Sequence, residues 1–304
     1  MTNRDAGLPT YSAAIVTFRR AELLKTVLMG LSGQSHPPAV TVVADNDPGE
    51  SAREVVESLK GGWPGQLIYS PVGGNVGPAG GWAHAVEVAR QDPHRGEWVL
   101  IIDDDDPIQA PDLASALLRK AAQTGATLGG MGLRGAVWDA RRARLQRIEP
   151  AEGETAPVDY LAGNGAPLYA WAAIDSVGFF QDDLFFGFED LDFGFRLRAN
   201  GWDLLAAPMP SIHTVPDTGG APSPWREYYK TRALLWILRK HGKPFAIGIT
   251  LARSVLLGGA VKAVKARTPA LFLARLQGGW DGLSGRLGVR RYNPSSNPPK
   301  SQTA

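Results

Sequence analysis

Short apolar runs alternate with longer segments of mixed apolar and polar residues through the first half of the chain. A short apolar run bounded by polar residues is typical of a buried strand, whereas apolar positions three and four residues apart are typical of a helix. The pattern predicts four strands, Tyr11–Phe18, Ala39–Ala44, Gln66–Ser70 and Trp98–Ile102. The helices predicted between and after them are Glu22–Leu31, Ser51–Leu59, Gly80–Arg90 and Ala110–Thr124.

This alternation of strand and helix predicts an α/β fold with a doubly wound, mainly parallel, Rossmann-like sheet. In such sheets, ligands bind beyond the carboxyl ends of the strands. Four polar segments follow the four predicted strands, and we expect them to meet at one edge: Thr17–Arg19, Asp45–Asp47, the loop Gly73–Gly81, and Asp103–Asp106.

Four consecutive aspartates, Asp103–Asp106, follow the fourth predicted strand. Neighbouring carboxylates repel one another and resist burial, so they need either solvent or a cation. Carboxylate oxygens are ligands that Mg²⁺ and Mn²⁺ prefer. Because side chains alternate in direction along a strand, Asp103 and Asp105 would point the same way and could share one ion, with Asp104 pointing elsewhere. A solvated turn that caps the next helix accounts for the same residues equally well.

A second acidic block, Glu189, Asp190 and Asp192, lies among aromatic residues where a helix is predicted to begin. Carboxylates at a helix N-terminus are stabilised by the helix dipole, which would give them a structural role. Apolar surroundings would also desolvate a carboxyl group and raise its pKa, which suits a general base near neutral pH. Asp190 or Glu189 is the candidate for that role.

The glycine-rich loop Pro71–Gly81 leads into a predicted helix. Glycines let backbone N–H groups approach a phosphate at a positively polarised helix start. The spacing lacks the opening Gly-x-Gly of the dinucleotide fingerprint, and there is no P-loop Gly-Lys-Ser/Thr, so a flexible surface loop is the alternative. Asp45 could accept a hydrogen bond from a base or ribose, or form a turn. His213 could be a metal ligand or an ordinary hydrogen-bonding histidine.

Composition narrows the class of protein. The chain has 304 residues, 44% hydrophobic and 20% charged, as expected for a globular protein. The absence of cysteine excludes disulfides and thiolate chemistry. A formal net charge of +2 gives no general affinity for polyanions, so we expect no nucleic-acid partner. The polar start, Met1–Ser12, lacks the apolar core of a secretory signal, which predicts a cytoplasmic location.

The C-terminal region is basic and partly apolar. Arg239–Arg291 contains eleven Lys or Arg residues and one acid, Asp281. Its two apolar runs, Phe245–Leu257 and Leu271–Leu276, are shorter than the ~20 residues of a transmembrane span, and Arg253 interrupts the first. Two arrangements fit this pattern: helices lying on an anionic membrane surface, or helices packed on the main domain with a solvated basic side.

Several short segments, in a fixed order, carry a family resemblance. They are Ile15–Arg20 (Ile-Val-Thr-Phe-Arg-Arg), Val42–Asn46 (Val-Val-Ala-Asp-Asn), Asn75–Gly81 (Asn-Val-Gly-Pro-Ala-Gly-Gly), Asp103–Asp105, Phe188–Asp192 (Phe-Glu-Asp-Leu-Asp) and His213. From roughly Ala13 to Lys240, the chain resembles the large inverting glycosyltransferase family 2. The block Tyr228–Arg232 and the triple aspartate look most like its galactofuranosyl- and rhamnosyltransferase branches, although Ala233 stands where those branches have asparagine.

The resemblance implies a GT-A fold over residues 1–240, with a basic, apolar helical extension at 241–291. Residues 292–304 are rich in Pro, Ser and Asn, so we expect them to be disordered.

The resemblance also assigns a role to individual residues. The nucleotide and sugar of the donor would be held by Thr17, Arg19, Asp45, Asn75, Gly77 and Asp104. Asp103, Asp105 and His213 would hold Mn²⁺ or Mg²⁺, and the extra aspartate, Asp106, leaves this register open by one residue. Asp190 would be the general base, oriented by Glu189 or Asp192.

The implied reaction is metal-dependent, inverting transfer of galactofuranose or rhamnose from a UDP or dTDP donor. The implied acceptor is a bacterial cell-envelope or surface glycan, free or lipid-linked, so the enzyme would work in the cytoplasm or at the cytoplasmic membrane face. One alternative is a sugar nucleotidyltransferase, which normally has a basic glycine-rich loop after its first strand. The other is a non-catalytic glycan-binding scaffold, which would not need the intact set of carboxylates.

Overall fold

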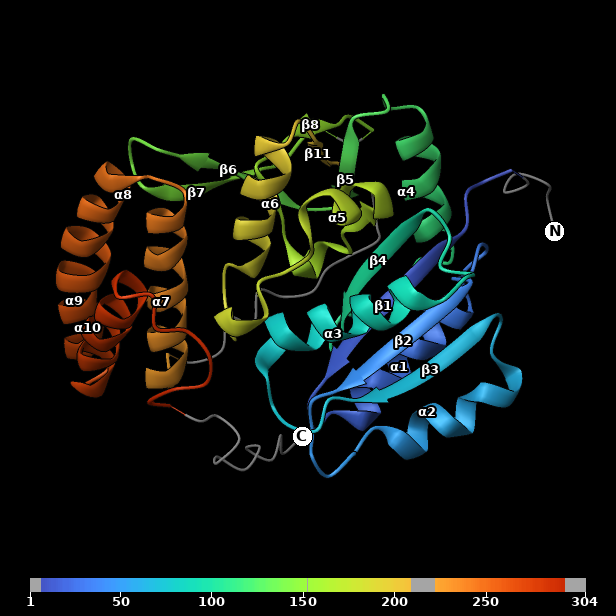
Figure 1. Ribbon diagram of the computed structural model, residues 1–304, viewed down its shortest axis with the longest axis horizontal. Coiled ribbons are helices and arrows are strands. Elements are labelled where there is room, and N and C mark those ends of the chain that lie inside the picture. The colour runs from blue at the N-terminus through green and yellow to red at the C-terminus, as the bar shows by residue number, and fades with distance from the viewer. Residues whose placement is uncertain (1–6, 152, 209–221, 293–304) are drawn as a thin grey trace.

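A mixed eight-stranded sheet forms the centre of the computed structural model, which describes residues 7–151, 153–208 and 222–292 (Figure 1). Its strands are β1 (Tyr11–Thr17), β2 (Val40–Asp45), β3 (Gln66–Pro71), β4 (Trp98–Asp103), β5 (Leu128–Gly132), β8 (Ala156–Pro157), β10 (Leu168–Ala170) and β11 (Asp203–Ala206). They lie in the order β3-β2-β1-β4-β10-β5-β11-β8. A smaller antiparallel sheet, in the order β7-β6-β9, consists of β6 (Gly135–Asp139), β7 (Arg144–Ile148) and β9 (Tyr160–Leu161).

The four strands predicted from the sequence form the parallel half of the central sheet. β1 pairs in parallel with β2 and β4, and β2 with β3. β10 runs antiparallel between β4 and β5, which makes the sheet mainly rather than wholly parallel. The predicted α/β class and doubly wound sheet are confirmed.

Helices cover both faces of this sheet because β1 is apolar on both sides. Ala13 and Ile15 belong to the core beneath α1 (Ala21–Ser32), α2 (Arg53–Leu59) and α4 (Leu113–Ala122). Ala14 and Val16 belong to the core beneath α3 (Gly77–Gln91), α5 (Trp171–Val177) and α6 (Glu189–Ala199). Continuous apolar runs, rather than alternation, are what a sheet covered on both faces requires.

A layer of helices lies at one end of the molecule, on the left of Figure 1. It consists of α7 (Pro224–Lys240), α8 (Pro244–Ile249), a π-helical segment (Thr250–Leu257), α9 (Gly258–Lys265) and α10 (Ala270–Leu283). α7 packs along α10, so this layer begins before the boundary at residue 240 that the sequence predicts. Apart from Tyr292, the predicted disordered tail lies outside the described residues.

The segments from Pro244 to Lys265 form one continuous helix of 22 residues. By length and composition, it is long and apolar enough to cross a membrane. The expectation that this region is too short for a span is therefore wrong about its length. The helix continues through the small and apolar residues after Leu257, and Arg253 is its only charge before Lys262.

Candidate active site

The carboxyl ends of β1 and β4 are joined by side-chain hydrogen bonds. Thr17 Oγ1 donates to Asp104 Oδ2 at 2.8 Å, and the Phe18 backbone N–H donates to the same oxygen at 3.4 Å. Asp104 is buried. The structure therefore brings together two residues predicted to bind the donor, Thr17 and Asp104, at the predicted edge.

Arg20 is a site residue that the sequence did not single out. Its Nη1 lies 3.0 Å from Asp104 Oδ1 and 2.7 Å from Asp105 Oδ2. The guanidinium thus offsets part of the charge of the aspartate cluster. The only signal in the sequence was the second arginine of Thr-Phe-Arg-Arg, since nothing along the chain shows which of the two faces the aspartates.

Strand β4 ends at Asp103, and a turn follows at Asp104 and Asp105. The expectation that Asp103 and Asp105 share a face because of strand alternation is therefore wrong in its reason, because the alternation stops where the strand stops. Asp103 is partly buried, and no described residue donates a hydrogen bond to its carboxylate. Burial and the neighbouring aspartates raise the pKa of Asp103 well above its usual range.

The glycine-rich loop contacts the segment that precedes the second acidic block. Gly77, the first residue of α3, has φ +74°, and a Cβ there would lie 2.0 Å from the Phe185 carbonyl oxygen. Asn75 Oδ1 accepts a hydrogen bond from Gly77 N at 2.9 Å, and Asn46 Nδ2 donates to Gly77 O at 2.9 Å. Only glycine fits at position 77. Close packing against Phe185 therefore explains this glycine without any bound phosphate, and phosphate binding by the loop stays a prediction.

The second acidic block begins helix α6, as predicted, and its first two carboxylates differ in exposure. Glu189 is buried, and its Oε2 has no hydrogen-bond partner among the described residues. Asp190 is partly exposed, and its Oδ1 accepts from Leu191 N at 2.9 Å. Burial raises the pKa of both carboxyls, and the charge of Glu189 and of Asp103 raises that of Asp190 further.

These contacts distinguish the two candidates for the base. A general base must reach the proton that it removes. Asp190 is accessible, lies at the same edge as Asp103, and has a raised pKa, whereas Glu189 is enclosed. Of the two candidates, Asp190 is therefore the one that a substrate could reach, and the role of general base stays a prediction.

Two further residues lie near this acidic pair and were missed in the sequence. The Asp190 charge contributes to a raised pKa of Tyr160, on β9, although burial is the larger cause. The Lys230 side chain passes beside Gly187, and its charge lowers the pKa of Glu189. Lys230 belongs to the Tyr-Tyr-Lys-Thr-Arg block, which was the available signal; Tyr160 had none.

Several residues near the carboxyl ends of the strands and the start of α6 have a strained backbone conformation. Seven non-glycine residues in the described part have positive φ, and three of them, Arg19, Phe185 and Phe188, border this edge. Such conformations cost on the order of 1–3 kcal/mol each and cluster at functional sites. The turn after β1 and the segment that leads into α6 therefore store strain.

Asp192 does not take part in this arrangement. Its carboxylate is fully buried and binds Arg196 Nε at 2.9 Å, Lys240 Nζ at 3.0 Å and His241 Nε2 at 2.9 Å. The expectation that Asp192 orients Asp190 is not supported, because its oxygens are occupied by Arg196 of α6 and by Lys240 and His241 at the C-terminal end of α7. Asp192 instead joins α6 to α7.

Replacing Asp192 by asparagine is expected to lower the free energy of unfolding by about 3 kcal/mol at neutral pH, because a buried charge with several cationic partners is removed. Burial raises the pKa of Asp192, but bonds from His241 and Lys240 and the charge of Arg196 lower it to about 2 overall. The unfolded-state pKa is about 3.9, so this stability is complete above about pH 4 and is lost as pH falls towards 2.

Urea unfolding of both proteins at several pH values measures this difference. The curves should converge near pH 2, and a difference that persists there would contradict the assignment. Glu57→Gln is the control, because the exposed Glu57–Lys60 pair should contribute under about 1 kcal/mol at any pH.

Asp45 and Arg19 both interact with other residues of this protein. The Asp45 carboxylate is fully buried and accepts from Asp47 N, Ala52 N and the Tyr69 hydroxyl at 2.9–3.0 Å. Arg19 Nε lies 3.0 Å from Asp47 Oδ1. The structure thus gives Asp45 a role in shaping the turn after β2, and contact of either residue with a donor stays a prediction.

Of the three predicted metal ligands, the structure describes only Asp103 and Asp105. His213 lies outside the described residues. Within 7–151, 153–208 and 222–292, no three His, Asp or Glu side chains are arranged to hold one ion. The donor set nevertheless fits a hard divalent cation, because Asp103 lies among mutually repelling carboxylates and lacks a hydrogen-bond donor from the described chain.

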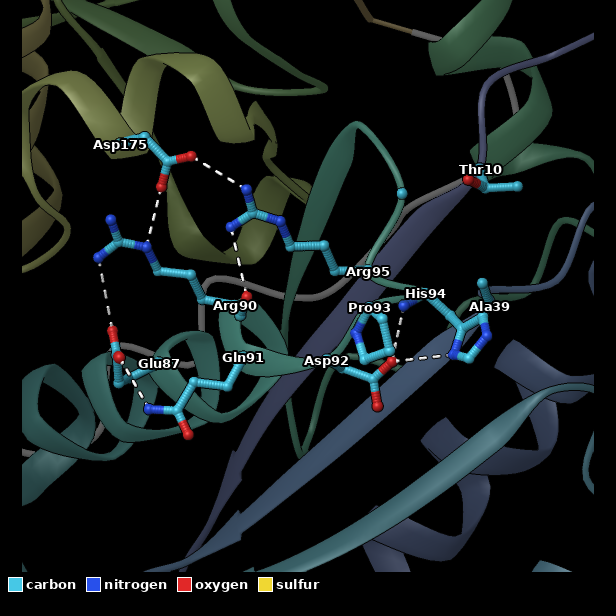
Figure 2. Close-up of a pocket in the computed structure, with 11 residues that line it drawn as sticks. Thr10, Ala39, Glu87, Arg90, Gln91, Asp92, Pro93, His94, Arg95 and Asp175 are labelled. Atoms are coloured by element: carbon cyan, nitrogen blue, oxygen red, sulfur yellow. Dashed lines mark hydrogen bonds and ion pairs between the residues drawn. The ribbon is translucent and has the colours of Figure 1, made fainter.

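A hollow of about 840 Å³ lies at the opposite edge of the sheet, by the amino ends of the strands. It is lined by Thr10 and Ala39, by the end of α3 and by the loop before β4. Figure 2 shows Asp175 between Arg90 and Arg95, which it binds at 2.9 and 3.1 Å. Asp175 therefore forms ion pairs with both arginines. None of the predicted site residues lines this hollow.

Known proteins resemble the chain at both the sequence and the structural level. The profile of the family described as "Glycosyltransferase like family 2" matches residues 9–233. A stretch of 110 residues is 34% identical to the galactofuranosyltransferase GlfT1 of Mycolicibacterium smegmatis, covering 35% of this chain and 33% of that protein. The chain therefore matches about a third of the length of that curated relative.

Solved structures share the fold at low sequence identity. The mannosyltransferase PcManGT from Pyrobaculum calidifontis, in complex with GDP-Man and Mn²⁺, has a TM-score of 0.57 and 15% identity, over 93% of this chain and 89% of that one. GalNAc-T7 with UDP, GalNAc and Mn²⁺ has a TM-score of 0.60 and 14% identity, over 92% and 58%. The predicted GT-A architecture with its helical extension is confirmed.

Proposed function

Because this chain belongs to the glycosyltransferase-like family 2, we propose that it transfers a sugar from a nucleoside-diphosphate donor to an acceptor hydroxyl, with inversion at the anomeric carbon. The observation that carries the proposal is the position of Asp190. It is an accessible carboxylate with a raised pKa, next to buried Glu189 and at the same sheet edge as the aspartate cluster. Family membership also favours sugar transfer over nucleotidyl transfer or a scaffold role.

The reaction is a single displacement. Asp190 accepts the proton of the acceptor hydroxyl as that oxygen attacks the anomeric carbon. The bond from this carbon to the phosphate oxygen breaks on the opposite face, and the nucleoside diphosphate leaves with the bonding electrons. A single accessible base fits an inverting course, because inversion needs only one attack on the anomeric carbon.

The aspartate cluster would hold a divalent cation. Asp103 and the exposed Asp105 would supply carboxylate oxygens, whereas Asp104 is buried and accepts hydrogen bonds from both Thr17 and Arg20. When bound, Mn²⁺ or Mg²⁺ would stabilise the charge of the leaving diphosphate as a Lewis acid. Arg20, which lies between Asp104 and Asp105, would keep both side chains in place.

The other predicted site residues would bind the nucleotide-sugar donor. Asn75 and Gly77 shape the start of α3, where backbone N–H groups and the helix dipole favour a diphosphate. Thr17, Arg19 and Asp45 lie at the ends of β1 and β2, where the nucleoside would bind. UDP-galactofuranose is the favoured donor, because the curated relative is a galactofuranosyltransferase; dTDP-rhamnose is second. The acceptor would be a cell-envelope glycan, free or lipid-linked, reached from the cytoplasm.

Donor binding and slow donor hydrolysis test this proposal. The purified chain would be titrated with UDP-galactofuranose, dTDP-rhamnose, UDP-glucose and UDP-galactose in the presence of Mn²⁺. Metal-dependent binding of one donor, with release of its nucleoside diphosphate, is the expected result. Failure to bind any nucleotide sugar, with or without metal, would refute the proposal.

Chelation is expected to weaken donor binding at least about tenfold, because the diphosphate would then meet uncompensated aspartates. Calorimetric titration with the nucleoside diphosphate in Mn²⁺ and in EDTA measures this change. Restoring Mn²⁺ should restore the affinity. Equal affinity in both conditions would show that the cluster does not hold a functional ion.

A further inference from the structure

Apolar side chains are exposed mainly on the C-terminal helices. Eleven large hydrophobic side chains are exposed in the described residues, and eight of them lie between residues 244 and 283. They are Phe245, Leu256, Leu257, Val261, Val264, Leu273, Leu276 and Trp280. The three on α10 follow one helical stripe, and the other five lie on the helix Pro244–Lys265. Apolar patches of this kind mark sites of contact with another phase or molecule.

The π-helical segment sorts these side chains onto one side of the helix. The buried residues are Ala246, Thr250, Val255 and Gly259, at intervals of four, five and four. A five-residue interval stays in line because the helix is π-helical over 250–257, with its wider turn. The opposite side is left with Phe245, Leu257 and Val264, which are 69%, 65% and 77% exposed.

We call this side the outer helical face and define it by Phe245, Leu256, Leu257, Val261 and Val264. In Figure 1, α8 and α9 lie at the far left, on the side of α7 away from the central sheet. An apolar hollow of about 440 Å³, lined in part by Val264 and Phe272, continues this face into the turn before α10. The face thus lies on the outside of the helical layer, away from the central sheet (Figure 1).

The charges around this face have one sign. No Asp or Glu occurs between residues 242 and 280, and Asp281, which follows, is buried. Arg253, Lys265 and Arg267 are exposed on or beside the face. An apolar helical face flanked by lysine and arginine complements an anionic bilayer surface, where apolar side chains enter the interface and cations meet the headgroups.

We infer that the outer helical face binds anionic lipid bilayers, with the helix Pro244–Lys265 lying flat in the interface. The helix is long enough to span, but its inner side is tied to the protein. Buried Glu227 of α7 binds Lys262 Nζ and Arg275 Nε, each at 2.6 Å. Spanning the bilayer would break the Glu227–Lys262 pair and expose the buried side chains of Ala246 and Val255, whereas lying flat keeps the pair and the burial. The inference does not rest on the proposed reaction.

Flotation with lipid vesicles tests this inference on the full chain. The chain should float with vesicles of phosphatidylcholine and phosphatidylglycerol, bind less to phosphatidylcholine alone, and bind less as salt rises. The double variant Leu257→Ser, Val264→Ser should lower the partition coefficient at least about tenfold, because two large apolar side chains no longer enter the interface. Leu23→Ser, Met29→Ser is the matched control, since both side chains are exposed on α1, and it should bind normally.

Each further outcome decides the inference. Alkaline carbonate should release the chain from vesicles, and retention would overturn the flat orientation. Normal flotation of the double variant, or no flotation of the native chain, would overturn the membrane assignment. A dimer that the double variant disrupts, without flotation, would assign the face to a second copy instead. Circular dichroism and unchanged donor hydrolysis show that the variants are folded.

Discussion

Replacing Asp190 by asparagine is expected to reduce sugar transfer by about a thousandfold and to leave the affinity for the donor nearly unchanged, because general base catalysis contributes factors of this order. Asparagine has the same size, and its side-chain oxygen can still accept the hydrogen bond from Leu191 N. Initial rates of transfer and calorimetric binding of the nucleoside diphosphate separate the two effects. Transfer at more than a tenth of the native rate, or loss of donor binding, would show that another group is the base.

The pH dependence of transfer gives a second test of the same residue. Burial and the charge of Glu189 raise the pKa of Asp190, and a base acts only when deprotonated. Transfer should therefore rise with pH above the range in which an ordinary aspartate has already lost its proton, and then level off. Glu189→Gln removes the neighbouring charge, so the rising limb should move to lower pH. Asp182→Asn, at an exposed carboxylate nearby, should leave the limb in place. A rate that falls with pH over this range would contradict the role of Asp190.

Replacing Asp103 by asparagine is expected to weaken Mn²⁺-dependent donor binding by at least about a hundredfold, since even residues that only orient a metal ligand change affinity by 10–100-fold. Without metal, the same change should stabilise the protein by about 1 kcal/mol, because one of several repelling carboxylates is gone. Titration of the nucleoside diphosphate with and without Mn²⁺, and urea unfolding in EDTA, measure the two effects.

The opposite signs of these effects separate a metal ligand from a structural residue. A structural aspartate would lose stability in EDTA, whereas a ligand of a bound ion should gain it. Asp112→Asn is the matched control, because this aspartate follows the cluster but is exposed. Unchanged metal dependence in Asp103→Asn would move the ligand to a neighbouring aspartate.

The parallel half of the central sheet could be predicted from the sequence, because its strands and helices show a clear local pattern of apolar and polar residues. β1 to β4 are short apolar runs, and their observed ends differ from the predicted ones by a residue or so. Because parallel strands end at the same edge, the neighbourhood of Thr17, Asp104 and the glycine-rich loop followed from the strand order alone. Family motifs then indicated which carboxylates matter.

The partners of individual side chains could not be predicted, because they depend on distant parts of the chain. Asp192 binds His241, and Arg20 binds Asp104 and Asp105, across 49 and 84–85 positions. Alternation along β4 gave the wrong argument for Asp103 and Asp105, because the end of a strand is set by tertiary packing. The π-helical segment likewise has no mark in the sequence, and it is what separates the faces of the C-terminal helix.

The close approach of Gly77 to the Phe185 carbonyl limits how this enzyme can be re-engineered. A carbonyl 2.0 Å from where a Cβ would stand leaves no tolerance between the glycine-rich loop and the turn before Asp190. A grafted loop with any side chain at position 77 would therefore displace the turn before Asp190, unless the turn at 185–188 is exchanged together with it. If the loop binds the donor and Asp190 is the base, as we propose, the two segments act as one unit, and chimeras should be designed with paired crossovers.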